Sequence, residues 1–430
     1  MALSLRYAKP KRNFLKEASI MNSGDTAWVL TASALVLLMT IPGLAFFYGG
    51  LVRRKNVLSI LMQCFIIVCV ISLQWVLFGY SLAFGPDFHG IIGTLEWAGL
   101  AGVGAAPNSN YAATIPHSAF MIFQAMFAVI TPALIIGAYA ERVKFPAFLL
   151  FTVLWATFVY DPLAHWVWGA GGWLKSLGGL DFAGGIVVHV SSGISALVLA
   201  LLLGKRVGYN HKPIRPHNLP FTVLGAALLW FGWFGFNAGS ALAADGLAAT
   251  AFVNTNTATA AAGLAWALIE WRHNGSPTIL GAATGAVAGL VAITPACGFV
   301  NPMNAMLIGI IVAFVCYIAV AVMKGKLGYD DSLDAFGVHG VGGTVGTLLT
   351  GIFAQKAINP AGADGLLFGN LHTFGIQCLM LVVTVVFAAI MTFIIFKIVD
   401  AAIGMRVEEK NEIIGLDLTQ QSEAAYTVIE

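Results

Sequence analysis

The segment Asp181-Phe182-Ala183-Gly184-Gly185-Ile186-Val187-Val188-His189 opens an apolar run with a carboxylate and places an imidazole eight residues further along. In a helix, which rises about 1.5 Å per residue, His189 would lie about 12 Å beyond Asp181. If the run crosses a bilayer, that imidazole lies in hydrocarbon, where an ionisable group is costly and usually faces a bundle interior or a cavity. A shorter relative of the motif recurs as Asp334-Ala335-Phe336-Gly337-Val338-His339-Gly340. The two histidines are therefore the first candidates for functional residues.

The composition is that of a membrane protein with several spans. Hydrophobic residues make up 59% of the chain and charged residues only 10%, whereas about 25% of an average soluble domain is charged. The formal net charge of +2 gives no indication of nucleic-acid binding. The 5 cysteines are scattered without the CxxC spacing of a metal site, and we expect them to be packing residues.

Apolar windows of about 20 residues predict eleven transmembrane helices. The predicted spans are 25–48, 57–84, 117–139, 146–169, 181–203, 221–242, 247–271, 278–296, 303–323, 336–355 and 371–400. The chain then divides into an N-terminal extension at 1–20, a transmembrane domain at 21–405 and a C-terminal tail at 406–430. The extension lacks the apolar core of a secretory signal, and we expect it to be flexible.

Basic residues are concentrated in alternate connections between the spans, and the opposite set of connections holds only Lys175 and Lys356. By the positive-inside rule the basic set is cytoplasmic, which predicts an outer N-terminus and a cytoplasmic C-terminus. The basic residues within 1–20 oppose this orientation, but they lie further from a span. The basic connections contain Arg53, Arg54, Lys55, Arg142, Lys144, Lys205, Arg206, Lys212, Arg215, Arg272, Lys324, Lys326, Arg406 and Lys410.

The spacing of the two aspartate–histidine motifs predicts an internal repeat. One motif opens span five and the other opens span ten, so the same device recurs after five spans. Because five is odd, the two copies must cross the membrane in opposite directions, as in transporters with inverted repeats and a site near the midplane. The sequence thus predicts an all-α polytopic membrane protein with an inverted five-plus-five repeat.

The ionisable groups predicted inside the spans are few, and they suit the passage of a neutral substrate. A path lined by neutral imidazoles and aliphatic side chains solvates a permanent cation poorly. The predicted outer ends of the spans are rich in aromatic rings, which attract cations by about 0.5–2 kcal/mol. A weakly acidic cation that sheds a proton, such as ammonium, fits both features. The groups concerned are Asp161, His165, Asp181, His189 and His339 inside, and Phe123, Phe127, Trp166, Trp168, Trp233, Phe234, Phe236 and Ser240 toward the outside.

Simpler interpretations exist for each of these residues. An outer tryptophan can belong to an interfacial aromatic belt. Asp181 can simply cap a helix and match its dipole. A single buried histidine is more often a satisfied core residue than a functional one. The recurrence of the motif and its surroundings favour the functional interpretation.

Long ordered motifs resemble the ammonium transporter (Amt/Mep/Rh) family, and the likeness, to the prokaryotic Amt type, covers nearly everything after Met21. The motifs are Phe46-Phe47-Tyr48-Gly49-Gly50-Leu51-Val52-Arg53-Arg54-Lys55-Asn56-Val57, Ala140-Glu141-Arg142, Ala164-His165-Trp166-Val167-Trp168-Gly169, Asp181 to His189, Gly232-Trp233-Phe234-Gly235-Phe236-Asn237-Ala238-Gly239-Ser240, Thr294-Pro295-Ala296-Cys297-Gly298 and Phe336-Gly337-Val338-His339-Gly340. The resemblance implies the family's eleven-span inverted-repeat fold, a homotrimer in the plasma membrane with one conduction path per subunit, and no cofactor, metal or enzymatic activity.

The resemblance also implies roles for individual residues. Trp168, Ser240 and Phe127 match the external recruitment site for ammonium. Phe127 and Phe236 match the phenyl gate beneath it. His189 and His339 match the twin histidines of the pore, which share a proton and conduct ammonia. The remaining matches are Asp181, which orients the recruitment side, and Trp233 and Thr294, which line the pore.

The tail resembles the family's cytoplasmic regulatory segment, which implies docking of a nitrogen-regulatory PII protein. The chain has Gln421-Ser422-Glu423 where many relatives have His-Gly-Glu. Two rival functions are a membrane ammonium sensor that signals through this tail and an intramembrane enzyme. For the enzyme, Asp161 and His165 lie at i and i+4 on one helix face, but a third metal ligand is not evident.

Overall fold

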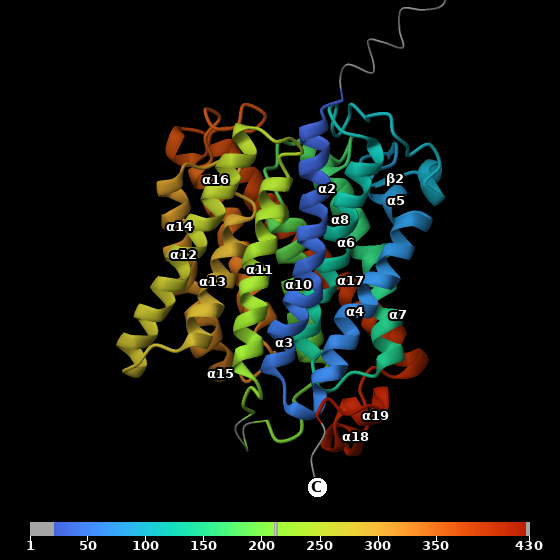
Figure 1. Cartoon of the computed structure of the whole chain (residues 1–430), viewed down its shortest axis with the longest axis vertical. Coiled ribbons are helices and arrows are strands. Elements are labelled where there is room, and N and C mark those ends of the chain that lie inside the picture. The colour runs from blue at the N-terminus through green and yellow to red at the C-terminus, as the bar shows by residue number, and fades with distance from the viewer. Residues whose placement is uncertain (1–20, 210, 212–213, 427–430) are drawn as a thin grey trace, which may run out of the picture.

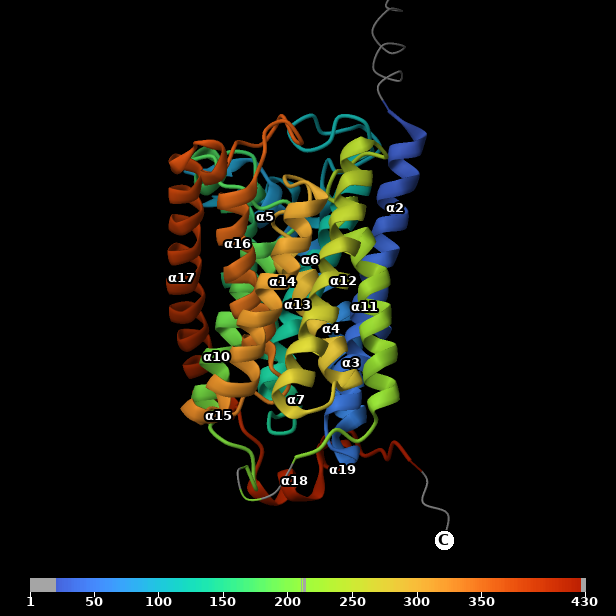
Figure 2. The ribbon, with the colours of Figure 1, turned by 90° about the vertical axis from the view of Figure 1, so that its left-hand side faces the viewer.

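The computed structural model describes residues 21–209, 211 and 214–426 and consists of long helices that run along one common direction (Figures 1 and 2). Within these residues, 9 helical segments are long and apolar enough to cross a membrane. They are Ser23–Leu51, Arg54–Phe84, His117–Tyr139, Phe145–Ser176, Gly185–Leu203, Leu219–Gly239, Pro302–Leu327, Phe336–Phe353 and Leu371–Ile403. The prediction of a helical membrane protein with several spans is confirmed. The extension predicted at 1–20 lies outside the described residues.

The bundle has two distinguishable ends. At the upper end in Figure 1, β1 (Asp87–Phe88) and β2 (Ile92–Gly93) form a small antiparallel hairpin, and η4 (Leu95–Leu100) follows it. At the lower end, the short helices α18 (Glu409–Ile414) and α19 (Leu416–Gln421) form the tail. These are called the hairpin end and the tail end below.

Most spans combine α-helical segments with short π-helical turns. Such turns are rare and frequently mark functional sites, and His189 and His339 both lie in one, η6 and η8. The π-helical turns are η1 (Met39–Leu44), η3 (Trp75–Gly79), η5 (Ala156–Tyr160), η6 (Gly185–Val190), η7 (Ile318–Met323) and η8 (Phe336–Gly340), and two short 3-10 turns are η2 (Arg54–Asn56) and η9 (Leu366–Phe368). The α-helical segments are α2 (Ser23–Leu38), α3 (Ala45–Leu51), α4 (Val57–Gln74), α5 (Tyr80–Phe84), α6 (His117–Tyr139), α7 (Phe145–Trp155), α8 (Asp161–Trp168), α9 (Trp173–Ser176), α10 (Ser191–Leu203), α11 (Leu219–Gly239), α14 (Pro302–Tyr317), α15 (Lys324–Leu327), α16 (Val341–Phe353) and α17 (Leu371–Ile403).

The predicted spans 247–271 and 278–296 coincide with α12 (Gly246–Asn274) and α13 (Ile279–Ile293). α12 carries buried polar residues, among them Asn254, Thr255 and Thr259, which lower its mean hydropathy. α13 is only 15 residues long. Both helices stand among the long spans (Figure 2), although neither meets the length and hydropathy of the other nine.

Glycine rows allow several of these helices to approach each other closely. A Cβ atom at Gly285 would lie 2.4 Å from the Cβ atom of Trp266, and one at Gly289 would lie 2.6 Å from that of Ala262. Both distances are far below van der Waals contact, so α13 packs this closely on α12 only because these positions lack side chains.

Candidate functional site

Asp181 forms the N-terminal cap of the helix that carries His189. Its carboxylate accepts hydrogen bonds from four backbone N–H groups, those of Gly184, Gly185, Ile186 and Val187, at 2.6–3.2 Å. The backbone carbonyl of the same residue accepts a hydrogen bond from Trp168 Nε1 at 2.9 Å. Asp181 therefore fixes both the start of η6 and the position of the Trp168 ring.

Asp331, rather than Asp334, is the counterpart of Asp181 in the second half of the chain. Its carboxylate accepts hydrogen bonds from the backbone N–H groups of Ala335 and Phe336 at 3.1 and 2.8 Å. It precedes His339 by eight residues, the spacing that separates Asp181 from His189. The sequence comparison, which paired Asp181 with Asp334, was wrong on this point. The equal spacing was the signal that could have identified the correct aspartate.

His189 and His339 meet in the middle of the bundle. Their Nδ1 atoms lie 3.3 Å apart, and their ring planes differ by only 20°. Both rings are buried. The helices can cross this closely because Gly193 faces Gly340, where an added Cβ would lie 2.1 Å from the Gly340 nitrogen. A hydrogen bond between two Nδ1 atoms requires one of them to carry a proton and the other to be bare.

Aromatic rings continue this arrangement toward the hairpin end. The Phe236 ring lies 6.1 Å from the His189 ring and 4.3 Å from the Phe127 ring, between centroids. Phe127 in turn meets Trp168 edge-on at 5.9 Å. Trp168, Phe127, Phe236, His189 and His339 therefore form one continuous row, called the central column below.

The other predicted site residues support the column. The Trp233 ring stacks on His189 with centroids 5.4 Å apart, and its Nε1 donates to Thr294 Oγ1 at 2.9 Å. Ser240 is half-buried, and its hydroxyl donates to the Phe236 carbonyl at 2.9 Å. The structure therefore brings together the nine residues to which the family resemblance assigned roles. Two further outer aromatic candidates lie elsewhere, since Phe234 stacks on Phe252 and Trp166 packs against Phe387.

Cavities lie at both ends of the central column. The hairpin-side cavity, about 360 Å³, is lined by Phe127, Trp168, Asp181 and Ser240 among others. The tail-side cavity, about 180 Å³, is lined by His339, Val338 and Tyr48 among others. A wider tail-side vestibule of about 580 Å³ follows it. The buried rings of the column separate the cavities at the two ends.

Sequence reasoning missed the residues that line the tail-side openings. Four residues, Leu51, Leu280, Leu333 and Asp334, line both the tail-side cavity and the vestibule. They come from three separate segments of the chain, and no local pattern relates these segments. Tyr48, Leu51 and Asp334 were quoted within motifs but not assigned to the tail-side openings.

Asp161 and His165 do not form a ligand pair. His165 Nε2 lies 2.8 Å from Asp87 Oδ1, and its Nδ1 lies 3.0 Å from the Ala83 carbonyl oxygen. Asp161 accepts instead from Gln74 Nε2 at 2.8 Å. In the part of the chain that the structure describes, no three His, Cys, Asp or Glu side chains are grouped to hold a metal ion.

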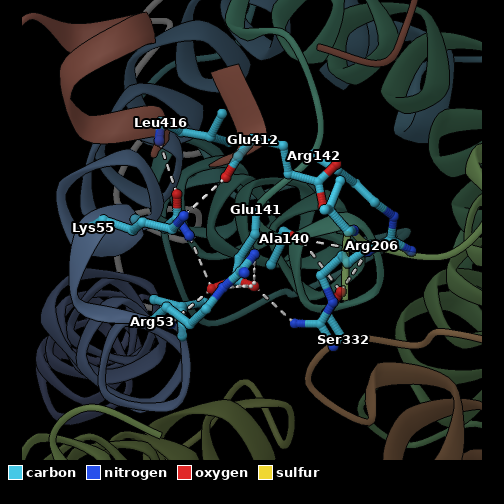
Figure 3. A network of polar contacts seen from close by, with 12 residues as sticks. Arg53, Lys55, Ala140, Glu141, Arg142, Arg206, Ser332, Glu412 and Leu416 are labelled. Atoms are coloured by element: carbon cyan, nitrogen blue, oxygen red, sulfur yellow. Dashed lines mark hydrogen bonds and ion pairs between the residues drawn. The ribbon is translucent and has the colours of Figure 1, made fainter. Parts of the chain in front are cut away.

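The tail end holds a buried network of charged groups (Figure 3). Glu141, whose side chain is fully buried, pairs with Arg53 at 2.9 Å and with Arg206 at 3.0 Å. Arg206 also pairs with Asp330 at 2.8 Å. Burial alone would raise the pKa of Glu141, but Arg206 and Arg53 outweigh burial and hold this pKa below its usual value. The pKa of Asp330 is likewise lowered, because Arg206 and Arg142 outweigh its burial.

The tail is attached to the same network. Asn56 donates to Glu141 at 2.9 Å and accepts from the Leu416 N–H at 2.8 Å. Asp417 accepts from the Ser59 N–H at 2.8 Å, and Lys55 donates to the Glu412 carbonyl at 3.1 Å. Figure 3 shows Lys55, Glu412 and Leu416 beside this charged cluster. The tail therefore packs on the connections between the spans.

Comparison with known proteins agrees with this geometry. The model of the Ammonium Transporter Family matches residues 27–426. An ammonium transporter of Bacillus subtilis (strain 168) is 57% identical over 94% of this chain and 99% of its own length. Among solved structures, Mep2 of Saccharomyces cerevisiae matches with a TM-score of 0.85 and 38% identity, covering 91% of this chain and 88% of its own. A protein described as a sensor Amt protein matches with a TM-score of 0.85 and 30% identity, covering 94% of this chain and 99% of its own. The chain belongs to the ammonium transporter family.

Proposed function

We propose that the chain is an ammonium transporter in which ammonium is gathered at the hairpin end, loses a proton at the phenylalanine pair and passes as ammonia along the two histidines. The observation that carries this proposal is the 3.3 Å approach of His189 Nδ1 to His339 Nδ1 between cavities at both ends of the column. Transport by relatives such as the Bacillus subtilis ammonium transporter supports the substrate.

Recruitment is assigned to Trp168, Phe127 and Ser240 in the hairpin-side cavity. Two aromatic faces and one hydroxyl oxygen suit a small cation that donates hydrogen bonds. The carboxylate of Asp181 is occupied by four backbone N–H groups, so it acts through its charge and by fixing the helix start, rather than by binding the ion directly. The backbone carbonyl of the same residue holds Trp168. We therefore assign Asp181 a positioning role.

Deprotonation is assigned to the Phe127 and Phe236 pair, whose ring centroids lie 4.3 Å apart. A cation that passes between these buried rings loses its water, which is heavily penalised in a low-dielectric interior. Neutral ammonia meets a much smaller penalty, so the ion transfers its proton to water in the hairpin-side cavity before the ammonia passes the rings. Beyond the rings, the histidine pair and Trp233 with Thr294 form the polar lining of an otherwise apolar path. Proton transfer by a separate route would make transport electrogenic.

The membrane arrangement is proposed as eleven helices in two inverted halves of five spans, followed by one further helix. Asp181 caps its helix beside Trp168 at the hairpin end, whereas Asp331 caps its helix next to Asp330 in the tail-end network. The same device therefore enters the bundle from opposite ends, which supports the inverted repeat. The transmembrane domain is assigned to 21–405.

The cellular setting is proposed from the charge pattern and the family. The plasma membrane would hold a homotrimer with an outer N-terminus and a cytoplasmic tail, and nitrogen metabolism would be its context. The tail at 406–430 would be regulatory. Its docking on the charged network supports regulation of transport, with a PII protein as partner.

A sensor function is the second candidate, because the chain is similar along 94% of its length to the sensor Amt protein. The packing of α18 and α19 against the bundle favours transport regulated by the tail over a separate signalling unit. Removal of residues 407–430 distinguishes the two. Full transport combined with lost nitrogen signalling in cells would favour the sensor.

Uptake of labelled methylammonium into proteoliposomes tests the proposal. Simultaneous His189→Ala and His339→Ala substitution should reduce uptake to the level of protein-free vesicles, because the polar lining of the path is lost. His372→Ala, a matched change at an exposed histidine, should leave uptake intact. Wild-type uptake by the double variant would contradict the assigned path.

A further inference from the structure

Among the described residues, Asp334 carries the one carboxylate that lines both the tail-side cavity and the vestibule, whereas Glu270 lines only the cavity. Asp334 and three leucines, Leu51, Leu280 and Leu333, line both spaces, so a molecule that moves between them passes this side chain. Asp334 adopts a positive φ of 62°, which is uncommon for a residue with a side chain. Unlike Asp331, whose carboxylate caps a helix, Asp334 presents its carboxylate to this passage.

An ammonium group already occupies that carboxylate. The Nζ atom of Lys324 lies 2.6 Å from Asp334 Oδ1, with the lysine and aspartate side chains 18% and 29% exposed. Lys324 also lines the vestibule. A lysine side chain ends in a primary alkylammonium, which carries the charge and the N–H donors of methylammonium.

We propose that Asp334 is a tail-side binding site for ammonium and small primary alkylammonium ions, and that Lys324 is a tethered competitor for this site. This inference rests on the proposed function, because it needs substrate to pass Asp334. A free cation entering from the vestibule must displace the lysine. The tether keeps the local concentration of the lysine ammonium high, so displacement costs affinity on that side.

The competitor changes affinity and not the direction of net transport. At equal substrate activities on both sides a passive path carries no net flux, whatever groups line it. Lys324 therefore weakens binding from the tail side while permitting rapid release of substrate that arrives from the hairpin side. The hairpin end has a different arrangement, since Lys175 Nζ donates to the Trp168 carbonyl at 2.9 Å and not to a carboxylate.

The test uses sealed membrane vesicles of both orientations that contain the full-length protein, with orientation checked by protease access to the tail. Initial uptake of labelled methylammonium gives a half-saturating concentration from each side. In Lys324→Met, the tail-side value should fall by about twofold to fivefold, the upper part of the range for loss of a partly exposed ion pair. Uptake from the hairpin side should persist.

Two further variants test whether the change in tail-side half-saturation comes from Lys324 and Asp334. Lys326→Met removes the same charge from an exposed position two residues away and should leave the tail-side value unchanged. Lys324→Met combined with Asp334→Asn should return it to the wild-type value or above, because the carboxylate that binds the cation is gone. An unchanged value in Lys324→Met, or an equal fall in Lys326→Met, would overturn the proposal.

Asp334→Asn alone covers the case in which Lys324→Met loses all uptake. It removes the proposed site, so its tail-side half-saturating concentration should equal or exceed that of the wild type, and a lower value would refute the site. Absence of uptake by the wild-type protein from either side would instead refute the proposed transport function itself.

Discussion

At the hairpin end, Asp181 gives its whole carboxylate to four backbone N–H groups, and aromatic rings and a hydroxyl line the cavity beside it. At the tail end, Asp331 caps with two N–H groups, and a second carboxylate, Asp334, faces the passage with a lysine bound to it. The helix cap is shared and the surroundings differ. Repetition of the helix cap therefore does not make the two mouths equivalent, and we expect the side chains around each cap to give the mouths different affinities for the substrate.

The largest expected effect is at the hairpin-end cap. Asp181→Ala leaves four N–H groups without their acceptor, while the backbone carbonyl that binds Trp168 remains, so stability should fall by about 5 kcal/mol or more. Asp331→Ala removes two such bonds and should cost about half as much. Thermal unfolding in detergent, together with methylammonium uptake, measures both variants. Equal losses would mean that the two caps contribute equally to the stability of the protein.

The charged network at the tail end should show the next largest effect. Glu141→Gln removes the carboxylate that pairs with Arg53 and Arg206 and should destabilise the protein by about 3–5 kcal/mol, as expected when one partner of a buried ion pair is lost. Chemical unfolding in detergent measures the loss. Glu409→Gln, at an exposed position in the tail, serves as the control and should cost little.

The stability difference between wild type and Glu141→Gln should depend on pH because the pKa of Glu141 is lowered in the folded protein. Because the folded pKa lies below the unfolded value of about 4.3, the ion pairs stabilise the fold fully above that pH and lose this contribution as pH falls through the folded pKa. The stability difference between wild type and Glu141→Gln should therefore be constant from pH 5 to 7 and shrink as the pH falls below the unfolded pKa of about 4.3. A difference that grows under acid would contradict the assigned pairs.

The aromatic site at the hairpin end should show an effect on affinity. Trp168→Leu removes one cation-binding face, so the half-saturating concentration of methylammonium from the hairpin side should rise by about 2-fold to 30-fold. The tail-side value should change much less if the two mouths act independently. A rise confined to the tail side would contradict the assignment of Trp168 to the hairpin-side binding site.

The smallest effect is expected for Lys175→Met at the hairpin end. Lys175 is exposed, and its ammonium donates to a carbonyl oxygen and lies 5.9 Å from the Tyr111 ring centroid, so half-saturation from either side should change by less than about twofold. The contrast with Lys324→Met tests whether a lysine competes with substrate at the tail end alone. A lowered hairpin-side value equal to the one expected for Lys324→Met would show that both lysines compete with substrate.

Much of the fold followed from the sequence, because apolar run length alone locates helices in a bilayer. Every predicted span coincides with helix, including α12 with its buried polar residues and the short α13. The choice of Asp334 as the partner of Asp181 failed because a cap depends on where the backbone turns, and proximity to the apolar run does not report this. The eight-residue spacing between aspartate and histidine identifies Asp331 as the capping residue.

The central column could be assembled from the sequence only with the help of the family resemblance. Phe127, Phe236 and His189 are distant in sequence, and residue type alone allows a membrane belt or an ordinary core. The Lys324–Asp334 pair and the docking of the tail on Asn56 and Ser59 were not predicted. These contacts depend on where whole helices end, and local patterns carry no information about that.

The protonation of the histidine pair tests the central claim most directly. Nitrogen-15 NMR of histidine-labelled protein in bilayers near neutral pH, with His339→Gln used for assignment, reports the state of each ring nitrogen. The proposed neutral pair predicts one protonated and one bare Nδ1, joined by a hydrogen bond across the 3.3 Å gap. Two protonated Nδ1 atoms, or two bare ones, would contradict a shared proton at the centre of the path.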